Sequence, residues 1–178
     1  TDPADYARLI AEMDEKGGAT SYDFRRMLAA KAYAATAAYD SMIASWFAFA
    51  DQGVAFPETL SLSSTLGATL RYGENPHQQA AFYVDGEQRP GIATAEQIQG
   101  KELSYNNLGD TDTAFELVSE FTGNPACAII KHANPCGLAC HPDLAEAYRR
   151  AYSGDPVSAF GGILGFNRTV TTETAREV

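Results

Sequence analysis

One short stretch, residues 126–137, limits the fold and the function more than any other part of the chain. Residues 126–130 (ACAII) are small or apolar, which predicts a strand covered on both faces of a sheet. Lys131 and His132 follow at once, and residues 134–137 (NPCG) predict a turn that ends the strand. Ligands bind at the carboxyl ends of strands in open α/β sheets. We therefore interpret Lys131 and His132 as the centre of a candidate active site.

The composition excludes some classes of partner. The chain has 178 residues, 45% of them hydrophobic, and a net charge of −10, which argues against a nucleic acid partner. No apolar run reaches the length of a membrane span, so we expect no membrane association. Three cysteines suit the reduced thiols of a cytoplasmic protein better than a disulfide framework. The chain does not begin with Met, and we expect it to be a fragment or a processed piece of a longer protein.

The pattern of apolar residues predicts a mixed helix and strand fold. The predicted elements are two helices between residues 3 and 50, strands at 61–70, 80–84, 126–130 and 163–166, a helix capped by Asp110 or Thr111, and a helix at 142–152. Strand, helix and strand in that order after residue 126 predict a parallel crossover and hence an α/β fold. The composition changes near residues 50–57, so we expect domains at 1–54 and 55–178.

Three further polar stretches are candidates for ligand binding. Arg71 offers a planar fork for a phosphate, and Tyr72 offers a stacking face or a hydroxyl. Asn107 precedes a predicted helix, where it can cap the helix or hold a polar ligand. Gly161, in a glycine-rich passage, would let a ligand approach the backbone. Each stretch also fits a plain surface turn or cap, and Lys131 and His132 also fit an ordinary surface pair, so spacing alone leaves both interpretations open.

A metal site is the main chemical alternative. Cys136, Cys140, His132 and His141 lie close together in the sequence. However, three residues separate the two cysteines, whereas the zinc deaminase signature has two, and no His-x-Glu stands upstream. We therefore expect no metal.

The four stretches together resemble a known family. Residues 71–78 (RYGENPHQ), 103–107 (LSYNN), 131–137 (KHANPCG) and 155–162 (DPVSAFGG) are similar to motifs of the bifunctional purine biosynthesis enzymes. These enzymes are phosphoribosylaminoimidazolecarboxamide (AICAR) formyltransferase/IMP cyclohydrolases. The resemblance spans the whole chain but only a middle portion of the family's protein.

The resemblance implies a fold and a reaction. Residues 1–54 would be the helical end of the cyclohydrolase domain, and residues 55–178 the start of a cytidine-deaminase-like transformylase domain that forms a homodimer. The transformylase moves a formyl group from 10-formyltetrahydrofolate, a co-substrate, to AICAR, and the cyclohydrolase then closes the ring to IMP. The expected folate-binding residues lie downstream, so we expect the isolated chain to be inactive.

The resemblance also implies residue roles. His132 would be the base near the AICAR amine, and Lys131 would stabilise the transition state or protonate the departing folate nitrogen. Lys131 and His132 would thus do the polarising work that a metal does in the deaminases. The implied contacts to the AICAR nucleotide are Arg71, Tyr72, Asn107 and the backbone of Gly161. Two alternatives remain: a nucleotide-binding module without chemistry, and an interaction module that no nucleotide stabilises.

Overall fold

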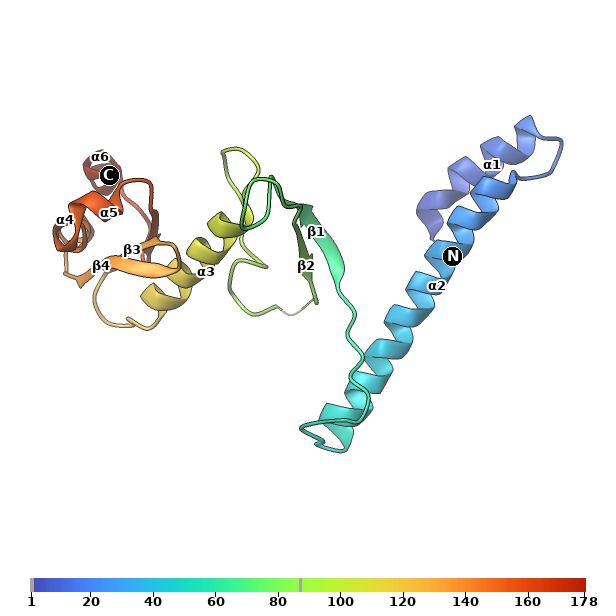
Figure 1. Ribbon diagram of the computed structural model, residues 1–178, viewed down its shortest axis with the longest axis horizontal. Helices are drawn as coiled ribbons and strands as arrows, with labels where there is room; N and C mark the ends of the chain where they lie inside the picture. The colour runs from blue at the N-terminus through green and yellow to red at the C-terminus, as the bar shows by residue number, and fades with distance from the viewer. Residues whose placement is uncertain (1, 87) are drawn as a thin grey trace. The chain divides into compact units, whose positions relative to one another are not determined.

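The computed structural model describes residues 2–86 and 88–178 (Figure 1). The chain divides by its internal contacts into two compact units, Thr1–Thr65 and Leu66–Val178, which we call the helical unit and the sheet unit. The predicted division at residues 54/55 concerns the domains of a longer protein and stays a prediction.

The helical unit consists of two helices joined by a short turn, and the first helix lies back along the second (Figure 1). Its elements are the 3₁₀ turn η1 (Pro3–Asp5), α1 (Tyr6–Glu15), α2 (Tyr22–Ser45) and the π-helical segment η2 (Trp46–Asp51). Asp2 accepts the N–H of Ala4 at the start of η1, and Ser21 caps α2 by accepting the N–H of Phe24. Glu12 also accepts the backbone N–H and the hydroxyl of Ser21, at 3.1 and 2.6 Å, which fixes the turn between α1 and α2.

The helical unit has almost no core of its own. Phe24, with the guanidinium of Arg8 4.8 Å from its ring centroid, is the one buried hydrophobic residue among the described residues of this unit. Large apolar side chains stay exposed along α2 and beyond, among them Tyr33, Met42 and Trp46. Burial of apolar area is the main driving force for folding, so this unit gains little from its own packing.

The sheet unit contains two small sheets and four helices among its described residues. Its elements are β1 (Thr65–Thr69), whose first residue is the last of the helical unit, β2 (Ala81–Val84), α3 (Tyr105–Ser119), β3 (Ala126–Lys131), β4 (Asn134–Cys140), α4 (Leu144–Gly154), α5 (Pro156–Ala159), β5 (Ile163–Phe166) and α6 (Thr172–Glu177). Strands β1 and β2 pair with each other, and the three-stranded sheet has the order β4-β3-β5. The content of helix and sheet confirms a mixed α/β fold.

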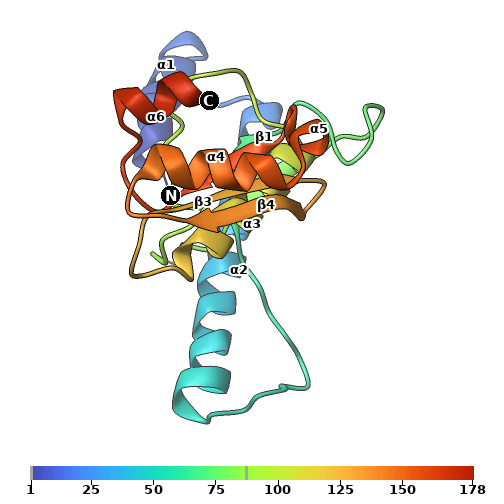
Figure 2. The same ribbon diagram turned by 90° about the vertical axis from the view of Figure 1, so that its left-hand side faces the viewer.

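The three-stranded sheet lies between two helices (Figures 1 and 2). Alternate residues of β3 point to opposite faces, and residues 126–130 are all buried, as the sequence predicted. One face packs against α4 in a cluster of Cys127, Ile129, Ala147, Tyr148 and Ala151. The other face packs against α3 in a cluster of Ala114, Val118, Ala128 and Ile130. The central strand therefore anchors both layers.

Two glycines let the helices approach the sheet closely. A Cβ atom built on Gly165 in β5 would lie 2.6 Å from the carbonyl oxygen of Ala114 in α3. A Cβ atom on Gly137 in β4 would clash in the same way with the carbonyl of Ala151 in α4. Both helix–sheet contacts depend on the missing side chain.

The predicted parallel crossover from β3 is wrong, because the expected turn at residues 134–137 is an additional strand. β4 pairs antiparallel with β3, and β5 also pairs antiparallel with β3. The crossover through α4 therefore joins β4 to β5, which run in the same direction on either side of β3. Pro135 is tolerated because β4 is an edge strand and the pairing shifts between Gly137 and Pro135, which makes Cys136 a bulge.

The predicted start of α3 is also wrong. The helix begins at Tyr105, and Ser104 is its N-cap instead of Asp110 or Thr111. Ser104 and Asn107 form a capping box, in which each side chain accepts a hydrogen bond from the backbone N–H of the other residue. Asp110 consequently lies within the helix, with its side chain free for another contact.

Candidate active site

The strand β3 ends in a tight hairpin turn made of His132 and Ala133. Lys131 pairs with Asn134, so the loop of the hairpin is two residues long. Both loop residues have positive φ angles, 57° and 56°, which is the requirement of a type I′ turn. Such turns normally use Asn and Gly, and the left-handed conformation costs about 1–2 kcal/mol for each residue with a Cβ atom. Backbone strain of this kind is concentrated at functional sites.

Two side chains hold this turn from outside the strand pairing. The carboxylate of Asp110 in α3 accepts the backbone N–H of Ala133 at 2.7 Å. The side-chain amide of Asn134 donates to the carbonyl oxygen of His132 at 2.7 Å. His132 itself is exposed, which leaves its imidazole accessible to a ligand. The sequence had indicated Asp110 only as a helix cap, and no local signal pointed to this contact.

Lys131 lies beside a second polar group. Its ammonium donates at 2.8 Å to the carbonyl oxygen of Phe160, the residue that precedes Gly161 in the sequence. Lys131 and His132 line a cleft of about 400 Å³ together with Asp155 and Ser158. The pKa of the Asp155 carboxyl is lowered, mainly by hydrogen bonds from Ser158, and the positive charge of Lys131 acts in the same direction. The cleft therefore combines a cation, an ionised carboxylate and an imidazole.

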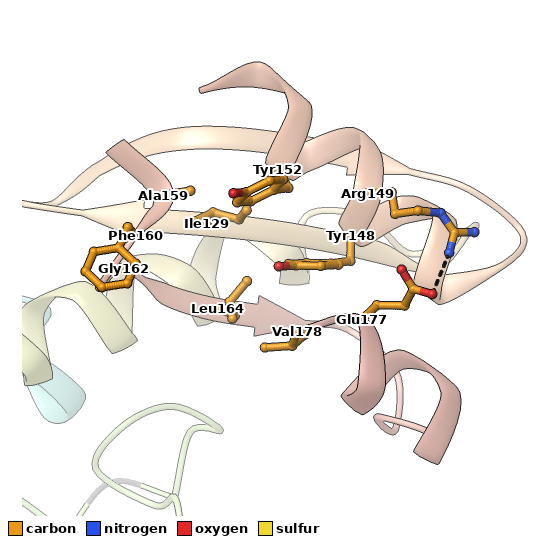
Figure 3. Close-up of a pocket in the computed structure, with 11 residues that line it drawn as sticks. Ile129, Tyr148, Arg149, Tyr152, Ala159, Phe160, Gly162, Leu164, Glu177 and Val178 are labelled. Atoms are coloured by element: carbon orange, nitrogen blue, oxygen red, sulfur yellow. Dashed lines mark ion pairs between the residues drawn. The ribbon is translucent and has the colours of Figure 1, made fainter. Parts of the chain in front are cut away.

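Gly161 lies at the edge of a different cleft, on the α4 side of the sheet. This cleft has a volume of about 550 Å³, and Tyr148, Tyr152 and Phe160 line it, as does Gly161 (Figure 3). Gly161 has a φ of 77°, which favours glycine. The structure thus brings Lys131 and Gly161 close to each other through Phe160 but places them in separate clefts.

Arg71 and Tyr72 form a stacked pair. The guanidinium of Arg71 donates to the Tyr72 hydroxyl at 3.2 Å and lies 4.9 Å from its ring centroid. The pKa of the Tyr72 hydroxyl is lowered, first by this hydrogen bond from Arg71 and then by one from Ser104. The backbone N–H of Arg71 donates to Leu103, and that of Tyr105 donates to Tyr72. The stretches at 71–78 and 103–107 are therefore docked on each other.

Asn107 is largely used by the helix it belongs to. Its side-chain oxygen accepts both the backbone N–H and the hydroxyl of Ser104, at 3.1 and 3.0 Å. The neighbouring Asn106 donates to the carbonyl oxygen of Glu74 at 3.1 Å. Capping explains the oxygen of Asn107, and the amide nitrogen is the group that it can offer to a ligand.

A third cleft, of about 730 Å³, joins three of the four stretches. His132 and Ala133 line it together with Asn75, Tyr105 and Asn106. Its volume is in the range of small-molecule sites, about 300–1,000 Å³. Among the described residues of the lining, Arg71, Tyr72 and Asn107 are absent, although Leu70 and Asn106, the residues before Arg71 and Asn107, take part. His132 is shared between this cleft and the one that contains Lys131.

The described residues contain no group of three or more His, Cys, Asp or Glu side chains arranged to hold a metal ion. Cys136 and Cys140 lie along the extended strand β4, four residues apart, which separates them by about 13 Å at the usual rise per residue. The three cysteines are free thiols. Within residues 2–86 and 88–178, every helix is too short or too polar to span a membrane.

The sequence comparisons decide the family. The sequence model of the AICARFT/IMPCHase bienzyme family matches residues 1–178. The chain belongs to this family. It is 57% identical over 180 residues to the bifunctional purine biosynthesis protein PurH of Rhizobium rhizogenes, which covers 100% of the chain and 33% of that protein. It is 60% identical over 179 residues to the PurH of Parvibaculum lavamentivorans, with 99% and 33% covered.

The family membership confirms the resemblance seen in the four stretches. The chain spans about a third of the length of the curated relatives it matches, among them a third PurH protein from Rhizobium meliloti that is 58% identical.

Proposed function

We propose that the complete protein containing this chain is an AICAR formyltransferase and IMP cyclohydrolase of purine biosynthesis. The observation that carries the proposal is the family match over all 178 residues. The relatives with 57–60% identity are named bifunctional purine biosynthesis proteins, which supports the same assignment. The chain would transfer no formyl group by itself, because about two thirds of the relatives' length lies outside it.

The proposed chemistry needs a base and a cation at one place. The 5-amino group of AICAR is a poor nucleophile, because its lone pair is delocalised into the ring and the carboxamide. A base must remove its proton as the amine attacks the formyl carbon of 10-formyltetrahydrofolate, and the resulting oxyanion needs a positive donor. The exposed His132 would be the base, and Lys131 would stabilise the oxyanion or protonate the departing folate nitrogen. Their shared cleft supports this division of roles.

The remaining predicted residues would hold the AICAR nucleotide. Arg71 would bind the phosphate and Tyr72 would contact the nucleotide, consistent with the exposed position of Arg71 and its stacking on the half-buried Tyr72. Asn107 would use its amide nitrogen, and Gly161 its backbone, to place the base or the carboxamide. Gly161 lines the cleft on the α4 side of the sheet, and Arg71 and Asn107 lie next in sequence to residues that line the cleft shared with His132.

We further propose the architecture that the family resemblance implies. Residues 1–54 would belong to the cyclohydrolase domain and residues 55–178 to a cytidine-deaminase-like transformylase domain, active as a homodimer in the cytoplasm. The poor core of the helical unit supports packing against further protein, and the three free thiols suit a reducing compartment.

An assay of the complete protein tests the proposed function. The purified enzyme, supplied with AICAR and 10-formyltetrahydrofolate, should produce formyl-AICAR and then IMP. AICAR alone should raise its melting temperature. Stabilisation by AICAR without any turnover would favour a binding module, and the absence of both would favour an interaction module.

A further inference from the structure

The contact between Asp110 and Ala133 has no part in the pairing of the strands. The ladder of the hairpin ends at Lys131 and Asn134, so the turn amides need partners outside the ladder. Asp110, 23 residues earlier in the sequence, supplies one of them through a carboxylate oxygen at 2.7 Å. A hydrogen bond from a backbone N–H to a charged acceptor is stronger than one to a neutral acceptor.

The turn needs such support because both of its residues carry a Cβ atom at positive φ. A residue in this conformation persists only when its surroundings hold it there. The direction of the His132 imidazole depends on the backbone of this turn. Asp110 is half-buried on the rigid helix α3, whose other face packs on the sheet, so it is a firm anchor for the turn.

We propose that Asp110 is a positioning residue that holds the His132–Ala133 turn in the geometry required for formyl transfer. The proposal rests on the proposed function, in which His132 is the base. Asp110 acts through the backbone of Ala133 and touches no reacting atom. A displacement of about 1 Å at a catalytic group is enough to lower turnover by about 100-fold.

The test uses four variants of the complete protein. Asp110→Ala removes the acceptor and leaves a residue that favours helix, so the fold should persist. Asp110→Asn keeps a neutral acceptor. Asp110→Ala combined with Ala133→Gly replaces the strained residue by one that adopts positive φ freely. Glu116→Ala is the matched control, an acid on the same helix whose side chain forms an exposed ion pair with Arg89.

The expected results separate positioning from substrate contact. Asp110→Ala should lower kcat by about 10- to 100-fold, with the KM for AICAR changed less than about threefold. If Asp110→Ala lowers kcat by about 100-fold, Asp110→Asn and the double variant should each have a kcat at least about tenfold higher than that of Asp110→Ala. Glu116→Ala should match the wild type. Hydrogen exchange of the Ala133 amide should be faster in Asp110→Ala than in the wild type.

Three outcomes would overturn the proposal. They are an Asp110→Ala variant with wild-type kcat, a loss that Ala133→Gly leaves unchanged, or an unaltered exchange rate at Ala133. Failure of the proposed function is distinguishable, because the wild-type protein would then transfer no formyl group. The exchange rate would still decide whether Asp110 holds the turn.

Discussion

The ammonium of Lys131 donates to the carbonyl oxygen of Phe160 at 2.8 Å, across 29 residues of sequence. The contact arises because β5 returns beside β3, which brings the loop before β5 to the end of β3. It joins the stretch at 131–137 to the stretch at 155–162. Two of the four family motifs therefore meet through one hydrogen bond.

Replacement of Gly161 by alanine tests the part of this loop next to Phe160. Gly161 has a φ of 77°, and a Cβ atom built on it has no atom within 4 Å, so only backbone strain opposes the change. We expect Gly161→Ala to cost about 1 kcal/mol and to shift the loop. If the backbone of Gly161 places the carboxamide, the KM for AICAR of the complete protein should rise about tenfold, which corresponds to about 1.4 kcal/mol.

The matched control is Gly123→Ala. Its Cβ atom would also meet no atom within 4 Å, but its φ is outside the left-handed region. We expect this variant to keep the wild-type KM and stability. An unchanged KM in Gly161→Ala would remove Gly161 from the proposed nucleotide site.

Replacement of two other glycines by alanine should change the free energy of unfolding in opposite directions. Gly165→Ala would place a Cβ atom 2.6 Å from the Ala114 carbonyl oxygen and force α3 away from β5. We expect the free energy of unfolding to fall by about 1–3 kcal/mol. Gly109→Ala, in the open middle of α3, should instead raise it by up to about 1 kcal/mol, because alanine favours helix. Urea unfolding of the chain measures both, and equal shifts would contradict the close packing at Gly165.

The thiol of Cys127 should be protected from reagents in the native state. It is fully buried in the cluster under α4, and burial raises its pKa to about 12. Cys136 and Cys140 are only half-buried. Alkylation at neutral pH, followed by mass spectrometry, should label Cys136 and Cys140 well before Cys127. Labelling of all three at one rate would contradict the packing of β3.

Because the pKa of the Cys127 thiol is raised, we expect the folded protein to lose stability at alkaline pH. The folded-state pKa is raised above the ordinary value of 9.0, so the folded protein keeps the proton that the unfolded chain releases. The contribution of the protonated Cys127 thiol to the free energy of unfolding is complete below about pH 9 and is lost as the pH rises toward 12. Cys127→Ala should flatten the pH dependence of unfolding in this window. An identical slope in the variant would exclude Cys127 as its source.

The sequence predicted the local parts of the fold that depend on apolar patterns. Five consecutive small or apolar residues identified β3, and the apolar pattern identified the two helices between residues 3 and 50. β4 was missed because Pro135 and Gly137 are typical turn residues, and only pairing with β3 makes them an edge strand with a bulge. The start of α3 was misplaced because its capping box has Asn107 at the position where Glu or Gln is usual.

The sequence predicted the part of the candidate site that follows directly from the apolar pattern of β3. Lys131 and His132 stand out in the sequence because they follow a buried strand. The contacts of Asp110 with Ala133 and of Lys131 with Phe160 join residues 23 and 29 positions apart. They depend on antiparallel pairing that the sequence pattern did not predict. The positive φ angles at His132 and Ala133 also follow from the hairpin and not from the residue types.

Replacement of Lys131 tests the cation of the proposed pair. Lys131→Met keeps the length of the side chain but removes the charge and the donor to Phe160. We expect the complete protein to lose formyl transfer by at least about 100-fold while AICAR still raises its melting temperature. Unchanged kinetics would assign Lys131 to the structure of the loop alone.

The kinetics of His132→Ala in the complete protein test most directly whether His132 is the base for formyl transfer. His141→Ala is the matched control, since the imidazole of His141 accepts the backbone N–H of Asp143 and lines neither of the clefts that contain His132. We predict that His132→Ala lowers kcat by about 10²- to 10⁴-fold, the usual contribution of a general base, while AICAR still binds. A kcat within about threefold of the wild type would contradict this role of His132.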